Sequence, residues 1–138
     1  MSAVAVGWTT SQDTAVSEGD TSTYSRTFTN EEVQQFAALS KDQGYHHMVE
    51  DEEGTVVLHG LLTATMPTKL GGDLDFLART MEFEFPRPAY TGVEITCEST
   101  IDEGTERDGR TEMVASFVCE TETGDVVLRG RSEGAVMG

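Results

Sequence analysis

Four segments in the second half of the chain alternate apolar side chains with polar or acidic ones. They are rich in Val, Thr and Phe, and breaks that contain proline or glycine separate them. Alternation with a period of two is typical of strands that bury one face, and these residue types favour extended backbone. The pattern therefore predicts a series of antiparallel strands joined by short turns. The four segments are residues 81–85, 93–101, 110–119 and 125–136.

Two stretches in the first half have the spacing of helices. Residues 29–40 open with Thr-Asn-Glu-Glu, a capping box, and continue with apolar residues that predict a short amphipathic helix. Residues 58–66 form the most apolar run in the chain and predict a buried helix that begins at Gly60 and ends before Gly71. Pro67 lies inside this helix, so we expect a kink or an early end near it.

These elements, with an early strand at residues 24–28, predict an α+β fold in which a curved antiparallel sheet wraps around the apolar helix. A chain of 138 residues is long enough for one such domain and leaves little room for a second core. Residues 1–22 contain few large apolar side chains, so we predict a mobile polar tail there and a single domain over residues 23–138. Residues 41–54 are predicted to be a loop.

Acidic residues dominate the charge of the chain. Twenty-five Asp and Glu stand against nine Lys and Arg, which gives a net charge of -16. Such a surface repels phosphate backbones and anionic bilayers, so we expect neither nucleic acid nor a membrane as a partner. The sequence has no run of the roughly 20 apolar residues that a membrane span needs. Because its first residues also lack the basic and apolar regions of a secretory signal, we expect a cytoplasmic protein.

The two cysteines, Cys97 and Cys119, each lie in an alternating apolar segment, and we predict that both are buried thiols. A disulfide between them, or a metal site formed with the three histidines, is the alternative. No two of these residues have the close spacing of a C-x-x-C ligand pair, so we predict no metal site.

Reactive groups gather in two segments of the first half. Asp42 and His47 lie in one loop after a predicted helix, and His59 and Gly60 lie where the buried helix begins. An imidazole beside a carboxylate can hold and polarise a water molecule. A glycine amide at a helix N-terminus can face an oxygen that gains negative charge. Together these groups suit addition of water next to a carbonyl, although each histidine alone also fits a surface or hydrogen-bonded core residue.

Five blocks of the sequence, taken together and in order, resemble the MaoC-like dehydratase family, which includes the (R)-specific enoyl-CoA hydratases. The resemblance covers about residues 24–138. The blocks are TNEEVQQFAALSKD at 29–42, His47, LHGLLTAT at 58–65, FPRPAYTG at 85–92 and GDVVLRG at 124–130.

The resemblance implies a hot-dog fold, assembled as a homodimer or a higher oligomer of dimers. It implies a hydro-lyase that converts a trans-2-enoyl thioester into a 3-hydroxyacyl thioester, with no separate cofactor because coenzyme A is part of the substrate. The family motif D-x-N-P-x-H places its carboxylate on Asp42 and its imidazole on His47. The amide of Gly60 is the implied donor to the thioester oxygen. His59 and its neighbour Leu61 are candidate substrate-binding residues.

The chain departs from the family motif in the loop that carries this pair. Gly44 and Tyr45 stand where the motif has Asn and Pro, and the segment from His47 to His59 is several residues shorter than usual. His46 is therefore a second candidate, for substrate binding or as the working imidazole. Adjacent side chains point apart, so we expect one of the two to face the site, and the motif register favours His47.

Two other functions fit the same fold. A non-catalytic module that binds acyl thioesters is one, and an acyl-CoA thioesterase is the other. Many thioesterases of this fold carry an acidic residue on the central helix, and residues 61–70 contain none, which favours a hydratase. The candidates for binding coenzyme phosphates are Arg79, Arg87, Arg129 and Arg131.

The distribution of charge predicts a dependence of stability on salt. The acids are spread along the whole chain and only Lys41 and Lys69 are lysines, so we expect a halophilic source. At 1 M salt the screening length falls to about 3 Å, which removes most of the self-repulsion. We predict that circular dichroism will show a folded chain in molar KCl and an unfolded one in dilute buffer. Equal stability in both would indicate an ordinary acidic cytosolic protein.

Overall fold

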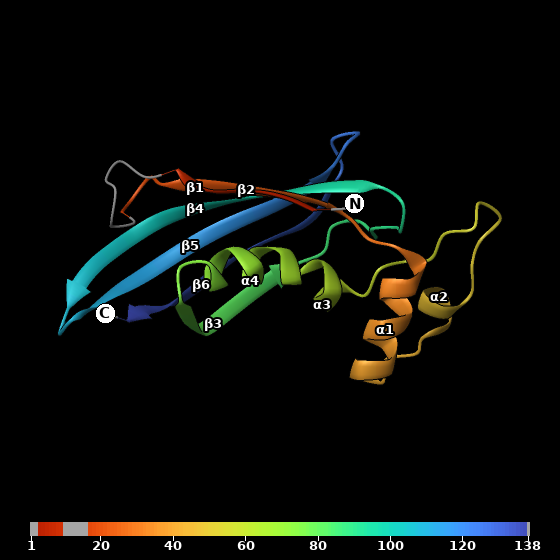
Figure 1. Ribbon diagram of the computed structural model, residues 1–138, viewed down its shortest axis with the longest axis horizontal. Helices are drawn as coiled ribbons and strands as arrows, with labels where there is room; N and C mark the ends of the chain where they lie inside the picture. Colours follow the sequence, from red (N-terminus) through yellow and green to blue (C-terminus); the bar gives the residue numbers. More distant parts are fainter. Residues whose placement is uncertain (1–2, 10–16, 138) are drawn as a thin grey trace.

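One antiparallel sheet and four helices make up the described part of the chain (Figure 1). The structure is a computed structural model and describes residues 3–9 and 17–137. Helices α3 and α4 lie along one face of the sheet, and α1 and α2 lie beyond its end. The elements are β1 (Ala3–Thr9), β2 (Thr21–Thr27), α1 (Asn30–Ser40), α2 (Tyr45–Met48), α3 (Gly60–Thr63), α4 (Thr65–Gly72), β3 (Phe76–Glu84), β4 (Glu94–Arg107), β5 (Arg110–Thr121) and β6 (Val126–Met137).

The sheet has the strand order β1-β2-β4-β5-β6-β3, and each neighbouring pair is antiparallel. The four strands predicted from alternation are confirmed, and β4 and β5 run further than the pattern indicated. They meet at a two-residue turn of Asp108 and Gly109, whose φ angles of 53° and 80° suit a tight hairpin. The predicted α+β arrangement, a curved sheet around a helix, is confirmed.

The N-terminal part differs from the prediction of a polar tail through residue 22. Residues Ala3–Thr9 form β1, which pairs with β2 from Ala3↔Arg26 to Thr9↔Thr21. Residues 10–16 lie outside the described part, and the chain after them is anchored because the Gly19 amide donates to the Ile101 carbonyl at 2.8 Å. An edge strand is held by backbone hydrogen bonds, which need no large apolar side chains, so composition did not reveal this one.

The first helix begins at the predicted capping box. The Glu32 amide donates to Thr29 Oγ1 at 3.1 Å, and the Thr29 amide donates to Glu32 Oε1 at 3.0 Å. Arg26 at the end of β2 forms an ion pair with Glu32 at 2.5 Å. Burial raises the pKa of Glu32, but the hydrogen bond from the Thr29 amide and the nearby Arg26 guanidinium outweigh it and hold this pKa below its usual value. The box thus fixes α1 directly after β2.

The buried helix is divided into α3 and α4 at Ala64. Pro67 lies in the first turn of α4, where its missing amide is tolerated. It has no N–H for the Thr63 carbonyl four positions earlier, which explains why the interruption lies just before it. The expected kink is therefore confirmed, whereas the predicted end before Gly71 is wrong because α4 continues to Gly72.

The core lies between α4 and the sheet. Met66 and Leu70 of α4 are fully buried and belong to one cluster with the strand residues that face them. Cys97 and Cys119 lie opposite each other in β4 and β5 and are free, buried thiols, as predicted. Hydrogen bonding to Cys97 and burial raise the pKa of the Cys119 thiol, which makes it unreactive. Among the described helices, none is both long and apolar enough to cross a bilayer.

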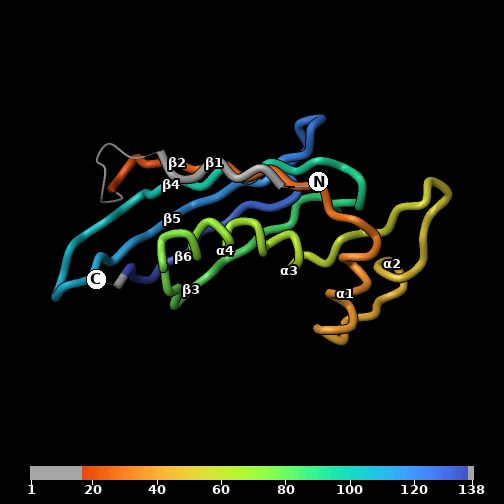
Figure 2. The backbone as a smooth tube through the Cα atoms, viewed as in Figure 1, coloured from red at the N-terminus to blue at the C-terminus, as the bar shows by residue number. Residues whose placement is uncertain are grey.

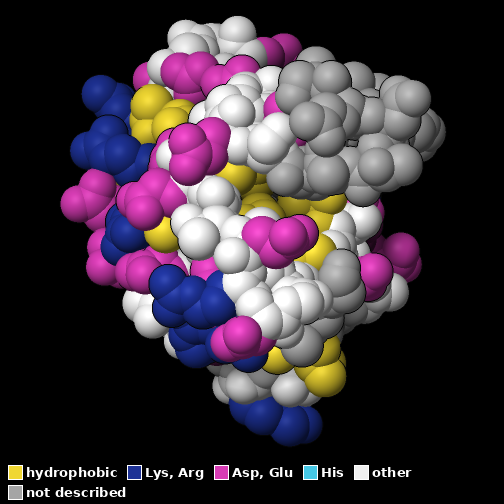
Figure 3. All heavy atoms as spheres, turned by 90° about the vertical axis from the view of Figure 1, so that its left-hand side faces the viewer, with side chains coloured by type: hydrophobic (Ala, Val, Ile, Leu, Met, Phe, Trp, Pro, Cys, Tyr) yellow, Lys and Arg dark blue, Asp and Glu magenta, His cyan; other side chains and the backbone are white. Residues whose placement is uncertain are grey.

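Basic side chains lie beside acidic ones at the end of the sheet that carries the β4–β5 turn (Figure 3). Glu112 of β5 accepts from Arg79 at 3.2 Å and forms an ion pair with Arg110 at 2.7 Å. Desolvation raises the pKa of Glu112, but the two guanidinium groups outweigh it and lower this pKa overall. Seven of the nine Lys and Arg side chains thus lie within 4 Å of a carboxylate.

Two glycines in β6 allow β3 to pair closely with it. After α4 the chain turns back into β3, which runs beside β6 (Figure 2). A Cβ atom added at Gly130 lies 1.9 Å from the Glu82 carbonyl oxygen, and one added at Gly134 lies 2.0 Å from the Leu77 carbonyl oxygen. Neither contact can be relieved by rotating a side chain, since both involve backbone.

We predict that Gly130→Ala forces β3 away from β6 and lowers the free energy of unfolding by about 1–3 kcal/mol. The matched control is Gly104→Ala in β4, because a Cβ there has Thr111 Cγ2 at 3.9 Å as its nearest neighbour. Denaturant unfolding in molar KCl measures both variants. Equal losses of unfolding free energy in the two variants would show that the contact with the β3 backbone is not the cause of the destabilisation.

Candidate active site

The segment after α1 returns to the start of α3 and brings three predicted site residues together. Asp42 follows α1, His47 lies in α2, and His59 immediately precedes α3. The His59 ring donates from Nε2 to the main-chain carbonyl of Asp42 at 2.8 Å. The Val57 amide donates to the His46 carbonyl at 3.0 Å, which holds the returning chain against α2. The predicted loop at residues 41–54 thus contains the short helix α2, and backbone hydrogen bonds fix its position.

Asp42 and His47 face each other across a short gap. His47 Nε2 lies 3.8 Å from Asp42 Oδ2, with the His47 side chain 7% exposed and that of Asp42 59% exposed. This separation is too long for a hydrogen bond, but one oxygen atom between the two groups can contact both. His47 Nδ1 lies 2.7 Å from the Val57 carbonyl oxygen. A carbonyl only accepts, so Nδ1 carries the hydrogen and the neutral ring presents a lone pair at Nε2.

The main chain also orients the Asp42 carboxylate. The Gly44 amide donates to Asp42 Oδ1 at 3.2 Å, which leaves Oδ2 on the side of His47. A Cβ at position 44 lies 3.2 Å from His46 Cε1, so the glycine leaves room for the neighbouring imidazole. His46 is exposed and its ring lies 3.9 Å from that of His47, whereas His47 is buried.

The ring of His59 stacks on that of His47. Their centroids are 3.7 Å apart and their planes differ by 15°. Phe36 of α1 contacts the His59 ring with a centroid separation of 4.9 Å. His59 Nδ1 is buried and has no hydrogen-bond partner among the described residues. The three rings form a continuous column from α1 to α2.

Gly60 is the first residue of α3, with its amide in the first turn. A Cβ there lies 2.9 Å from two atoms of the Phe85 ring, so the glycine allows Phe85 to approach the start of the helix. The motif reasoning did not identify Phe85 as a site residue, although it lies in one of the blocks used for the resemblance. In the sequence, Phe85 is distinguished only as an aromatic residue next to Pro86, which does not indicate contact with Gly60.

One cavity of about 640 Å³ adjoins all of these groups. A neighbouring cavity of about 410 Å³ shares Arg87, Pro88 and Ala89 with it. The structure therefore brings the predicted catalytic residues and the predicted substrate-binding residues other than the arginines to one place. Those that line the larger cavity are Asp42, His46, His47, His59, Gly60 and Leu61.

The four candidate arginines have different surroundings. Arg87 lines both cavities, is 67% exposed and lies 3.8 Å from Asp125, a long and weak contact. Arg129 donates to Glu84 at 2.8 Å, and the pair lines a separate depression on the sheet. Arg131 also lines that depression, and Arg79 lines another beside Glu112. Arg87 is thus the candidate that the structure places at the site.

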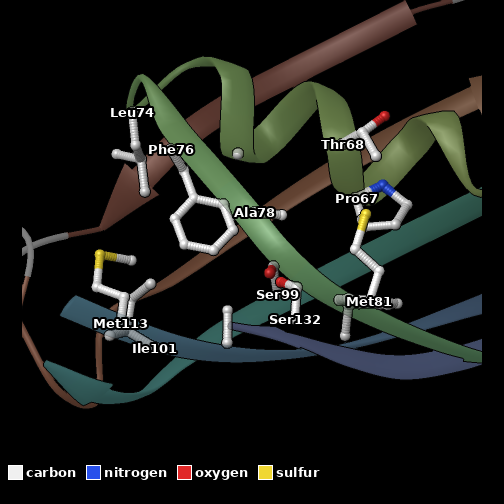
Figure 4. Close-up of a pocket in the computed structure, with 13 residues that line it drawn as sticks. Pro67, Thr68, Leu74, Phe76, Ala78, Met81, Ser99, Ile101, Met113 and Ser132 are labelled. Carbon is white, nitrogen blue, oxygen red and sulfur yellow. The ribbon is translucent and has the colours of Figure 1, made fainter. Parts of the chain in front are cut away.

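A further, apolar cavity of about 90 Å³ lies between α4 and the sheet (Figure 4). Three residues with hydroxyl side chains, Thr68, Ser99 and Ser132, also line it. Phe83 contacts Phe117 of this cavity with a centroid separation of 5.8 Å and Phe85 of the larger one at 6.2 Å. The main apolar wall residues are Leu74, Phe76, Met81, Ile101, Met113 and Phe117.

Asp42, His47 and His59 also offer ligand atoms within 4.8 Å of one another. A carboxylate and two imidazoles form a donor set that zinc or iron can use. The lone pairs of an imidazole lie in its plane, and the two planes here are nearly parallel and 3.7 Å apart. They do not converge on one point, so an ion shared by both rings would require one ring to rotate out of the stack. The geometry suits proton transfer better than metal binding.

Comparison with models of known protein families gives no match, and neither does comparison with curated proteins. Several solved structures are similar over most of the chain. The (R)-hydratase from A. caviae involved in PHA biosynthesis is 21% identical, with a TM-score of 0.77 over 91% of this chain and 100% of its own. R-hydratase PhaJ1 from Pseudomonas aeruginosa is 18% identical, with a TM-score of 0.76 over 88% of this chain and 82% of its own.

The MaoC-like dehydratase from Rhodospirillum rubrum is 20% identical, with a TM-score of 0.72 over 88% of this chain and 93% of its own. These similarities show that the chain has the hot-dog fold, as the resemblance implied.

Proposed function

We propose that this protein is an (R)-specific enoyl-CoA hydratase or 3-hydroxyacyl-thioester dehydratase, which adds water reversibly across the double bond of a trans-2-enoyl thioester. The observation that carries the proposal is the gap of 3.8 Å between His47 Nε2 and Asp42 Oδ2, in the cavity that Gly60 also lines. The hot-dog fold, which the named (R)-hydratases and the MaoC-like dehydratase share, supports the same class of enzyme.

In this reaction a water molecule lies between Asp42 and His47. The carboxylate accepts one hydrogen bond from it and His47 Nε2 accepts its other proton as the water oxygen bonds to C3. Electron density moves to the thioester oxygen, where the Gly60 amide at the start of α3 stabilises the developing charge. The proton held by His47 then returns to C2, so one water is consumed and no proton is released.

The two ends of the substrate have different surroundings. Arg87 faces the phosphates of coenzyme A at the outer side of the site, since it lines the main cavity and its neighbour. The acyl chain extends towards the apolar cavity beside α4, and Phe83 lies between the two cavities. In this arrangement the apolar part of the substrate lies towards the cavity beside α4 and its anionic part lies at Arg87.

We also propose a homodimer formed through β3. This strand pairs with β6 on one side, and in the described sheet its other edge has no neighbouring strand. Leu77 is 68% exposed there, and Met81 is also exposed. An open edge with exposed apolar side chains is a surface that a second copy can cover.

We predict that the protein hydrates crotonyl-CoA in molar KCl, measured as loss of the enoyl absorbance. Asp42→Asn and His47→Ala should each lower kcat/KM by on the order of 10²–10⁴, because each removes a group that handles the water proton. Circular dichroism should show intact folding, since both residues lie outside the sheet core. Asp102→Asn is the matched control, because Asp102 is exposed on β4 and lines another surface depression.

Three results would contradict this function. Wild-type activity in both site variants would remove the proposed site. Release of free thiol without hydration would indicate the thioesterase, although residues 61–70 lack an acidic side chain. Binding of crotonyl-CoA without either reaction would indicate the non-catalytic module. The altered motif, with Gly44 and Tyr45 in place of Asn and Pro, is the reason to test for it.

We predict that Arg87→Gln raises the KM for crotonyl-CoA about tenfold and leaves kcat unchanged, the loss expected for one charge-assisted hydrogen bond. Its contact with Asp125 is long and exposed, so a phosphate can replace that carboxylate at little cost. Arg129→Gln is the matched control, because the Arg129 side chain is 54% exposed and pairs with Glu84 away from the cavity. Equal KM values for both variants would exclude Arg87 as the phosphate ligand.

A further inference from the structure

We infer that His59 is a positioning residue, which holds Asp42 and His47 in register without touching the substrate. The inference rests on the proposed function, because it concerns the pair that handles the water. It also revises the role expected for His59 from the sequence, where it was a candidate for substrate binding. His59 adjoins the cavity, yet the residue is only 2% exposed, its Nε2 is engaged by the Asp42 carbonyl, and its unpaired Nδ1 is buried.

The first contact of His59 fixes the main chain at Asp42. Its Nε2 donates to the Asp42 carbonyl at 2.8 Å, across 17 positions of sequence. The other hydrogen bonds described for Asp42 are local. Its amide donates to Ser40 Oγ, and its Oδ1 accepts from the Gly44 amide. The bond from His59 is therefore the one among these that ties the exposed Asp42 to a distant, buried element.

The second contact fixes the ring of His47. The two rings stack at 3.7 Å with planes 15° apart, while His47 Nδ1 is held by the Val57 carbonyl. Phe36 contacts the His59 ring and so limits its movement. A ring that is packed and hydrogen-bonded in this way has one orientation, and that orientation keeps Nε2 of His47 beside Asp42.

A third observation explains why this position carries histidine. His59 Nδ1 is buried without a partner, a feature that costs free energy and that a native structure rarely keeps without a reason. Glutamine would supply the donor to Asp42, and phenylalanine would supply the flat ring against His47. Of these three side chains, only histidine offers both the donor and the ring. Its second nitrogen, Nδ1, is then left without a partner. Because His59 also precedes Gly60, it links the pair to the amide at the start of α3.

The two contacts can be separated by two substitutions. His59→Gln keeps an N–H donor towards Asp42 and loses the stacked ring. His59→Phe keeps the ring and loses the donor, and it also removes the unpaired nitrogen. We expect each variant to lower kcat for crotonyl-CoA by about tenfold to a hundredfold through misplacement of the reacting groups, with KM within about twofold of the wild-type value. We expect His59→Phe to unfold at a denaturant concentration no lower than that of the wild type.

A slower enzyme that is equally stable is the result that a purely structural role would not give. Wild-type kcat in both variants would overturn the inference, and so would a raised KM with unchanged kcat, which would indicate substrate binding. Nitrogen-15 NMR of His47 provides a readout that needs no activity. We expect a single Nδ1–H tautomer in the wild type and a mixture in His59→Gln.

This measurement also separates the inference from the proposed function. A wild-type protein that does not hydrate crotonyl-CoA, but whose His47 signals change in His59→Gln, would exclude the hydratase and retain the positioning role. Unchanged His47 signals in both variants would exclude the positioning role whatever the activity.

Discussion

The packing of α4 against the sheet is the interaction on which the rest of the structure depends. Met66 and Leu70 are fully buried there, and each fully buried side chain of this size contributes about 1.5–3 kcal/mol. Because α3 leads directly into α4, this packing also fixes where α3 begins. His59 and Gly60 stand at that point, so the reactive end of the site is attached to the most apolar part of the fold. Asp42 after α1 and His47 in α2 then pack against the fixed start of α3.

Main-chain groups, more than side chains, complete the site. The carbonyls of Val57 and Asp42 each accept from one imidazole, and the Gly44 amide donates to the Asp42 carboxylate. None of these contacts requires the Asn and Pro that the D-x-N-P-x-H motif has where this chain has Gly44 and Tyr45. A main-chain amide at position 44 does not require asparagine. Position 45 is the first residue of α2, where proline is favoured for its fixed φ but tyrosine can adopt the same conformation.

The sequence predicted the parts of this structure that depend on local periodicity. The alternating segments became strands, the capping box at Thr29 begins α1, and Pro67 accompanies a break in the central helix. It did not predict β1, because an edge strand depends on backbone pairing. The motif located Asp42 and His47, yet the bond from His59 to the Asp42 carbonyl joins groups 17 positions apart and leaves no periodic signal. The sequence also could not show which of the four candidate arginines lies at the cavity, because that depends on how distant segments pack.

The acidity of the chain limits how an anionic substrate can be recognised. With a net charge of -16 the protein repels coenzyme phosphates at long range in dilute buffer. In molar salt this repulsion is screened within about 3 Å, and only contacts at hydrogen-bond distance retain their strength. Under the proposed function, the exposed Arg87 guanidinium beside the cavity, 3.8 Å from Asp125, would make such a direct contact with a phosphate. A highly acidic surface and a phosphate-bearing substrate are therefore compatible, provided that recognition occurs by direct contact and not by the overall field of the protein.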